Sequence, residues 1–172
     1  MFRSIAVLAM LLAVFSRSLG LSMRSKSISS TKQNIILYDG VCNFCNSWVD
    51  LLLKLDRKKK FSFAALQSDE GQDLLQRIGK SRDDLSSVVF IQSLAEGGPS
   101  AEDKVYFKSD AAIRVAEELT GAPGPIASLI TAGFPKSMRD TLYDGVATNR
   151  YSILGKREEC RCSDATSPER FL

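Results

Sequence analysis

Two cysteines two residues apart, Cys42 and Cys45, carry the clearest chemistry in this sequence. They stand where a β-type run gives way to a helical pattern. A thiol in the first turn of a helix faces unpaired backbone N–H groups and the positive end of the helix dipole, which favour the thiolate. A second thiol one turn later can close a disulfide with the first. The spacing predicts a redox-active dithiol, with two inert buried cysteines as the alternative.

Asp39, three residues before Cys42, admits two interpretations. Its carboxylate can accept a backbone N–H from Val41 or Cys42 and so shape the turn, which is the commoner role of such residues. It can also take a proton from Cys45, although a negative charge close by raises the pKa of a thiol. Arg150 could supply a compensating positive charge, but a solvated helix face is the simpler expectation for it.

Cys160 and Cys162 leave three alternatives open. They are a second redox pair that relays electrons to the first, or free thiols in a flexible tail, or half of a four-thiolate zinc site with Cys42 and Cys45. Zinc ribbons usually pair two Cys-x-x-Cys loops, so a distant Cys-x-Cys pair gives zinc little support. The sequence has no histidine, which excludes Ser-His-Asp and Cys-His catalysis and histidine-ligated metals.

Alternating strand and helix patterns surround the dithiol. Apolar and β-favouring runs predict strands, and apolar residues at helical spacing with Ser caps and Gly stops predict helices. In chain order the predicted elements are a strand at 34–38, a helix at 43–55, a strand at 61–65, a helix from a Ser68 cap to Ile78, strands at 87–92 and 104–108, a helix from a Ser109 cap to Gly121, and helices at about 126–130 and 137–154. The first strand–helix–strand unit implies a parallel strand pair, and the next two strands form a hairpin.

This order is that of the thioredoxin fold. We expect an α/β protein whose central mixed sheet of about four strands is flanked by helices, with an extra C-terminal helical segment. The chain has 172 residues and 44% hydrophobic composition, enough for one core of ordinary size. Thioredoxins place a cis-proline before the strand that faces the dithiol, yet residues 84–87 contain no proline. A different loop must then shape the substrate groove, or the substrate is not an extended peptide.

Residues 1–31 have the pattern of a targeting leader, so we expect the domain to occupy residues 32–172. The apolar run at 5–15 is too short to span a bilayer, which needs about 20 residues, and is typical of a signal peptide cleaved near Gly20. A Ser-rich stretch with basic and no acidic residues follows, as in transit peptides. Together the two halves resemble a bipartite leader for a complex plastid. Secretory-pathway and mitochondrial locations are alternatives, and a membrane anchor or a disordered tail is the simpler interpretation.

The net charge of residues 32–172 does not favour binding to nucleic acid or to a membrane surface. Four of the 23 Lys and Arg residues and none of the 20 Asp and Glu residues lie within residues 1–31. The rest, 19 basic and 20 acidic residues, give a net charge of −1. We therefore expect no nucleic-acid partner and no stable membrane span once the leader is removed.

Asp39, Cys42 and Cys45 form an Asp-x-x-Cys-x-x-Cys signature that resembles the DCC family of thioredoxin-like thiol-disulfide oxidoreductases. The runs at 66–68, 108–112, 135–140 and 147–151 are similar to the same family and follow in the same order, so the resemblance covers about residues 34–172. By position and by this resemblance, Cys42 is the attacking thiolate and Cys45 the resolving thiol. We therefore expect protein thiol and disulfide substrates, an electron-donating reductase, no bound cofactor and a monomer.

Two other functional classes stay open at the level of sequence. One is a redox-inactive thioredoxin-like adaptor within an organelle, and the other is a structural zinc protein. Insulin-disulfide reduction with a Cys42→Ser variant distinguishes the first, and the zinc content of protein purified under reducing conditions distinguishes the second.

Overall fold

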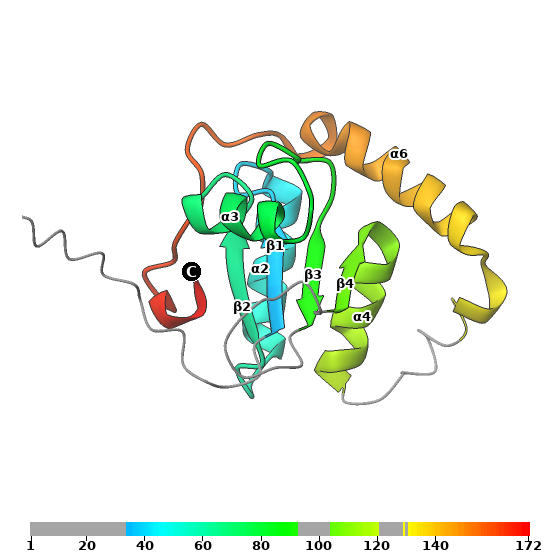
Figure 1. The fold of residues 1–172 in the computed structure, drawn as a ribbon, viewed down its shortest axis with the longest axis horizontal. Helices are drawn as coiled ribbons and strands as arrows, with labels where there is room; N and C mark the ends of the chain where they lie inside the picture. The colour runs from blue at the N-terminus through cyan, green and yellow to red at the C-terminus, as the bar shows by residue number, and fades with distance from the viewer. Residues whose placement is uncertain (1–33, 93–103, 121–128, 130) are drawn as a thin grey trace, which may run out of the picture.

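A four-stranded mixed sheet with the strand order β2-β1-β3-β4 forms the centre of the fold (Figure 1). The computed structural model describes residues 34–92, 104–120, 129 and 131–172. The elements are β1 (Asn34–Tyr38), α2 (Asn43–Leu55), β2 (Phe61–Ala65), α3 (Asp69–Arg77), β3 (Val89–Gln92), β4 (Lys104–Phe107), α4 (Lys108–Thr120), α6 (Lys136–Leu154) and the 3-10 turn η1 (Pro168–Arg170). β1 runs parallel to β2 and antiparallel to β3, and β3 runs antiparallel to β4. This is the thioredoxin-like α/β arrangement that the element order predicts.

Both faces of β1 are covered, because all five of its residues are buried. Side chains alternate between the two faces of a strand. Ile36 and Tyr38 therefore share a core with residues of α2 and α4, whereas Ile35 and Leu37 share a second core with α3. The carboxyl end of β1, which leads into the dithiol, therefore lies in a central strand with helices on both sides of the sheet.

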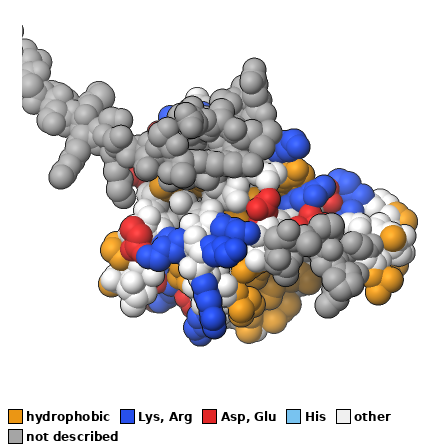
Figure 2. All heavy atoms as spheres, turned by 90° about the horizontal axis from the view of Figure 1, so that it is seen from below, with side chains coloured by type: hydrophobic (Ala, Val, Ile, Leu, Met, Phe, Trp, Pro, Cys, Tyr) orange, Lys and Arg blue, Asp and Glu red, His pale blue; other side chains and the backbone are white. Residues whose placement is uncertain are grey.

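The two helices that flank β2 begin and end as their sequence signals predict. Cys42 is the N-cap of α2, and Val49 and Leu52 on the inner side of that helix are buried. Ser68 caps α3 by accepting the N–H of Gly71 at 3.1 Å. Leu51 and Leu55 on α2 are exposed, and Figure 2 shows hydrophobic side chains gathered on one face of the molecule beside lysine and arginine side chains.

The start of α4 differs from the prediction. The helix begins at Lys108, so Ser109 is not its cap. The Ser109 hydroxyl faces α6 instead, where it donates a hydrogen bond to Asp140 at 2.5 Å and accepts one from Arg139 at 3.3 Å. The sequence pattern could not anticipate this, because the partners come from a helix far along the chain. The predicted helix at 126–130 and the leader at 1–31 lie outside the described residues, apart from a helical residue at 129.

The last helix, α6, lies over the ends of α2 and α4 rather than inside a core (Figure 1). None of its 19 residues is buried. After α6 the chain returns across the molecule to β2, where the Leu172 N–H bonds the Phe63 carbonyl at 2.9 Å. Within the part of the chain that the structure describes, no helix has the length and apolar character needed to cross a membrane.

Candidate active site

Cys42 and Cys45 come together at the start of α2, both as free thiols. Cys42 has extended backbone angles, and its Sγ accepts the backbone N–H of Cys45 at 3.4 Å. The two differ in exposure, because Cys42 is 0% exposed whereas Cys45 is half-buried. The structure therefore places the dithiol where the sequence predicts it, but with Cys42 covered.

Asn46, one turn into α2, holds the loop that carries the dithiol. Its side-chain amide donates to the carbonyls of Gly40 and Cys42, both at 2.9 Å. This side chain is 4% exposed. Sequence reasoning missed Asn46, because an Asn within a helical pattern carries no sign of such a contact.

Asp39 is the centre of a hydrogen-bond network around the dithiol, and it is 3% exposed. One carboxylate oxygen accepts the Val41 N–H at 3.2 Å and the Gln67 side-chain amide at 2.7 Å. The other accepts the Arg150 guanidinium at 2.9 Å and the Tyr151 hydroxyl. The contact to Val41 is the turn-shaping role predicted for Asp39. Because four donors surround the carboxylate, this residue joins the loop to the turn after β2 and to α6.

Arg150 does not lie on a solvated helix face, which was the simpler expectation. Its side chain is 11% exposed and pairs with Asp39, and it also donates to the Leu85 carbonyl at 2.9 Å. Contacts between α6 and the dithiol loop carry no signature in the sequence. The run at 147–151 resembled the family, but that resemblance assigned no role to either Arg150 or Tyr151.

The electrostatics around Cys45 oppose its ionisation. Burial, the hydrogen bond with Cys42 and the negative charges of Cys42 and Asp39 raise the pKa of Cys45 to about 12, and only the positive charge of Arg150 acts against them. Cys45 therefore keeps its proton at neutral pH. A thiol in this state is a poor attacking nucleophile but can serve as the resolving group once a base removes its proton.

An apolar groove of about 460 Å³ opens beside Cys45. Cys45 and Asp39 line it, whereas Cys42 does not. Its apolar walls come from three helices: Phe44 and Trp48 of α2, Ala112 and Ile113 of α4, and Leu142 and Val146 of α6. A ligand bound in this groove would therefore contact Cys45 and the apolar side chains around it.

α6 also contacts the segment before β3, where thioredoxins carry a cis-proline. The Tyr143 hydroxyl accepts the backbone N–H of Val88 at 2.9 Å, just before β3. None of the peptide bonds in the described ranges is cis. Both the loop residues Leu85 and Ser87 and the helix α6 therefore line the groove beside the dithiol.

Residues 155–162, which we call the strap, cover the other side of the dithiol loop. Gly155 ends α6 with a φ of 79°, a conformation that glycine adopts without strain and that turns the chain towards the loop. Lys156 then forms an antiparallel bridge with Cys42. The Arg157 N–H bonds the Val41 carbonyl at 2.7 Å, and the Arg161 N–H bonds the Gly40 carbonyl at 3.0 Å. These contacts place the backbone of the strap against the loop and against Cys42, which is 0% exposed.

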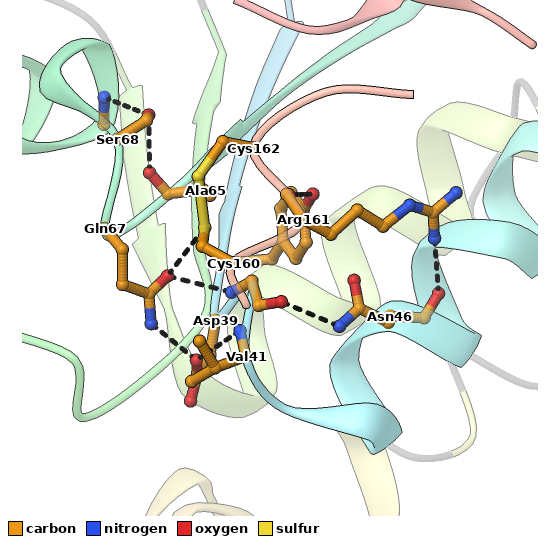
Figure 3. The surroundings of a disulfide bond; sticks show 12 residues. Asp39, Val41, Asn46, Ala65, Gln67, Ser68, Cys160, Arg161 and Cys162 are labelled. Carbon is orange, nitrogen blue, oxygen red and sulfur yellow. Dashed lines mark hydrogen bonds between the residues drawn. A yellow bond between two sulfur atoms is a disulfide. The ribbon is translucent and has the colours of Figure 1, made fainter. Parts of the chain in front are cut away.

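Cys160 and Cys162 are joined by a disulfide within the strap (Figure 3). They are therefore not the free tail thiols of one alternative. Two of the four sulfurs are bonded to each other, so the four cysteines do not form a tetrahedral thiolate set. Among the described residues, no three Cys, Asp or Glu side chains are grouped so that they could hold a metal ion.

Comparison with known proteins agrees with the Asp-x-x-Cys-x-x-Cys signature of Asp39, Cys42 and Cys45. A family model described as DCC1-like thiol-disulfide oxidoreductase matches residues 36–156. The uncharacterized protein YuxK of Bacillus subtilis is 40% identical over 138 residues, which is 80% of this chain and 93% of that protein. A chloroplastic DCC family protein of Arabidopsis thaliana is 36% identical over 136 residues, or 79% of this chain and 73% of that protein. No solved structure matches significantly. This chain belongs to the DCC1-like thiol-disulfide oxidoreductase family.

Proposed function

We propose that this protein exchanges disulfides with protein thiols through the dithiol of Cys42 and Cys45. The observation that carries the proposal is the pair of free thiols at the start of α2, one of which opens into an apolar groove. The groove suits the apolar side chains that flank a cysteine in a substrate protein. A partner reductase returns the dithiol to its reduced state.

The exchange proceeds in two displacements. The Cys42 thiolate attacks one sulfur of the substrate disulfide, forming a mixed disulfide and releasing the other substrate sulfur as a thiolate. Cys45 then loses its proton and attacks Cys42 Sγ, which forms the Cys42–Cys45 disulfide and releases the second substrate thiol. Two electrons pass from the protein to the substrate, whose two thiolates take up the proton that Cys45 loses and one from solvent.

Asp39 has a positioning role in this mechanism. Its two oxygens already accept four hydrogen bonds, which fix the loop before Cys42. Proton transfer from Cys45 to Asp39 is the alternative role. An Asp39→Asn variant separates the two, because an amide keeps much of the turn geometry but cannot accept a proton at neutral pH.

Insulin-disulfide reduction tests the proposal. Wild-type protein with a dithiol reductant should accelerate the reduction, Cys42→Ser should abolish the acceleration, and Ser152→Ala on the exposed side of α6 should retain it. A redox-inactive adaptor is the second candidate, because the complete burial of Cys42 favours it. Wild-type protein without activity, or a fully active Cys42→Ser variant, would establish the adaptor.

The proposal also covers where the protein is located in the cell and its oligomeric state. We assign residues 1–31 to a plastid-targeting leader and residues 32–172 to the domain, supported by the chloroplastic relative and the leader composition. A fluorescent protein fused behind residues 1–31 should accumulate in the plastid, and accumulation in mitochondria or in the secretory pathway would refute the assignment. We propose that the protein acts as a monomer and binds no nucleic acid. Light scattering after size exclusion tests the first statement, and a gel-shift assay tests the second.

A further inference from the structure

The disulfide between Cys160 and Cys162 lies directly against the loop that carries the dithiol (Figure 3). A Cβ atom added to Gly40 would stand 2.7 Å from Cys160 Sγ, so only glycine allows this approach. Gln67 accepts the Gly40 N–H at 2.9 Å and faces Cys160 Sγ at 3.9 Å. The mechanism above makes no use of this second pair.

Arg161, the residue between the two cysteines, anchors the strap to three parts of the site. Its N–H bonds the Gly40 carbonyl at 3.0 Å, and its own carbonyl accepts the Tyr38 hydroxyl at the end of β1. Its guanidinium pairs with Asp50 of α2 at 2.7 Å and also with Asp164. The disulfide closes a small ring around Arg161, which restricts the backbone that makes these contacts.

The strap lies against Cys42. Cys42 is 0% exposed, and the strap residue Lys156 pairs with it across the loop. An attacking thiolate must reach the substrate sulfur in line, so a covered Cys42 cannot take the first step of the exchange. A group packed against Cys42 must therefore move during turnover, and the strap is one of these groups.

We propose that Cys160 and Cys162 are a second redox-active pair, whose disulfide holds the strap over Cys42 and whose reduction by a dithiol releases it. This inference rests on the proposed function, since it names the regulation of the same site. A reductant reaches the pair through a surface hollow of about 460 Å³ that Arg157 and Cys160 help to line. Cys160 and Cys162 are themselves only half-buried.

The reduction of the Cys160–Cys162 disulfide by an external dithiol proceeds in two displacements. One thiolate of the external dithiol attacks a sulfur of the Cys160–Cys162 disulfide, which breaks that bond and forms a mixed disulfide. The second thiol of the reductant then displaces the protein sulfur and closes the disulfide of the reductant. Two electrons and two protons reach Cys160 and Cys162, and Arg161 loses the ring that restricted it.

Alkylation of Cys42 tests the proposal in the full chain. A Cys45→Ser background prevents Cys42 from pairing with Cys45, and N-ethylmaleimide labelling is followed by peptide mass spectrometry before and after dithiothreitol treatment and removal. We expect Cys42 to react at least tenfold faster once Cys160 and Cys162 are reduced. A Cys45→Ser, Cys160→Ser, Cys162→Ser variant should react at the fast rate in both conditions. Equal Cys42 rates in the oxidised and reduced Cys45→Ser protein would overturn the proposal.

Two side-chain variants separate release of the strap from unfolding. Arg161→Ala keeps the disulfide and the backbone bonds of the strap but removes the ion pairs with Asp50 and Asp164, so it should speed Cys42 labelling in the oxidised protein by less than reduction does. Arg157→Ala removes an exposed side chain that makes no such pair and should leave the rate unchanged. Circular dichroism must show the same folded signal for both variants. A faster rate for Arg157→Ala, or an oxidised Arg161→Ala protein that labels no faster than the oxidised parent, would contradict the role of the Arg161 side chain.

The labelling result does not depend on turnover, so the two proposals fail separately. Redox-dependent labelling in a protein that cannot reduce insulin would refute the oxidoreductase function alone. If the protein reduces insulin but the labelling rate of Cys42 is the same with Cys160 and Cys162 oxidised or reduced, the redox role of this second pair alone would be refuted.

Discussion

Replacing Arg150 with methionine should weaken both the fold and the dithiol site. Arg150 and Asp39 are 11% and 3% exposed and lie 2.9 Å apart, so solvent screens their interaction poorly. Methionine fills much of the same volume but leaves the Asp39 charge and the Leu85 carbonyl without this partner. Removing one member of a buried ion pair costs about 3 to 5 kcal/mol, and we expect a loss near the lower end because Asp39 keeps three other donors.

Urea unfolding of four proteins measures this coupling. The set is wild type, Asp39→Asn, Arg150→Met and the double variant. Because the double variant removes both charges, it should recover at least 1 kcal/mol of the sum of the two single losses. Arg150→Lys is the matched control, since it keeps the charge but loses the forked geometry, and it should fall between wild type and Arg150→Met.

The same variant should alter the chemistry. Arg150 is the positive charge that lowers the pKa of Cys45 against burial and Asp39. Without it Cys45 ionises less readily, so the mixed disulfide should accumulate and the pH–rate profile should move to higher pH. Two results together would refute an energetic link between the Asp39–Arg150 pair and the dithiol. One is a loss of unfolding free energy in the double variant equal to the sum of the two single losses, and the other is an unchanged pH–rate profile in Arg150→Met.

Three further predictions follow from other contacts. Gly40→Ala should lower the unfolding free energy by about 1 to 3 kcal/mol, because its methyl group would meet Cys160 Sγ at 2.7 Å. Gly145→Ala in α6, with open space around it, should be neutral or stabilising, so equal melting shifts in the two variants would contradict the packing argument. Since the pKa of Cys45 is raised from 9.0 to about 12, folding stability should be full below pH 9 and decline as the pH rises towards 12. Burial also raises the pKa values of Tyr38, Tyr143 and Tyr151, so Cys45→Ser should lessen that decline rather than remove it, and a decline of unchanged size in this variant would refute the contribution of Cys45. Phe44→Ala, which removes a 45% exposed groove side chain beside Cys45, should slow insulin reduction several-fold more than reduction of a small soluble disulfide. Equal slowing of both substrates would exclude the groove from protein recognition.

The elements near the dithiol were predictable because local chemistry determines them. The apolar run at 34–38, the helical spacing after Cys42 and the Ser68 cap each act over a few residues, and the structure confirms all three. The parallel pairing of β1 and β2 followed from the helix between them. Strong local signals of this kind do not depend on distant partners.

The parts that sequence reasoning missed depend on contacts between distant residues. The strap bonds the dithiol loop largely through backbone groups, such as the Arg157 N–H, and backbone contacts leave no residue pattern. Arg150 was noticed as a charge, but its contact with Asp39 spans 111 positions. Ser109 failed as a cap because its hydroxyl has partners in α6.

The separation in sequence between the dithiol and the strap also sets the order in which the site is assembled. The Tyr38 hydroxyl and the Arg161 carbonyl are 123 positions apart, so closing this contact needs nearly the whole domain. During synthesis β1, α2 and β2 emerge from the ribosome long before the strap. A nascent chain therefore presents Cys42 uncovered, and the strap can protect this thiol only after translation has passed residue 162.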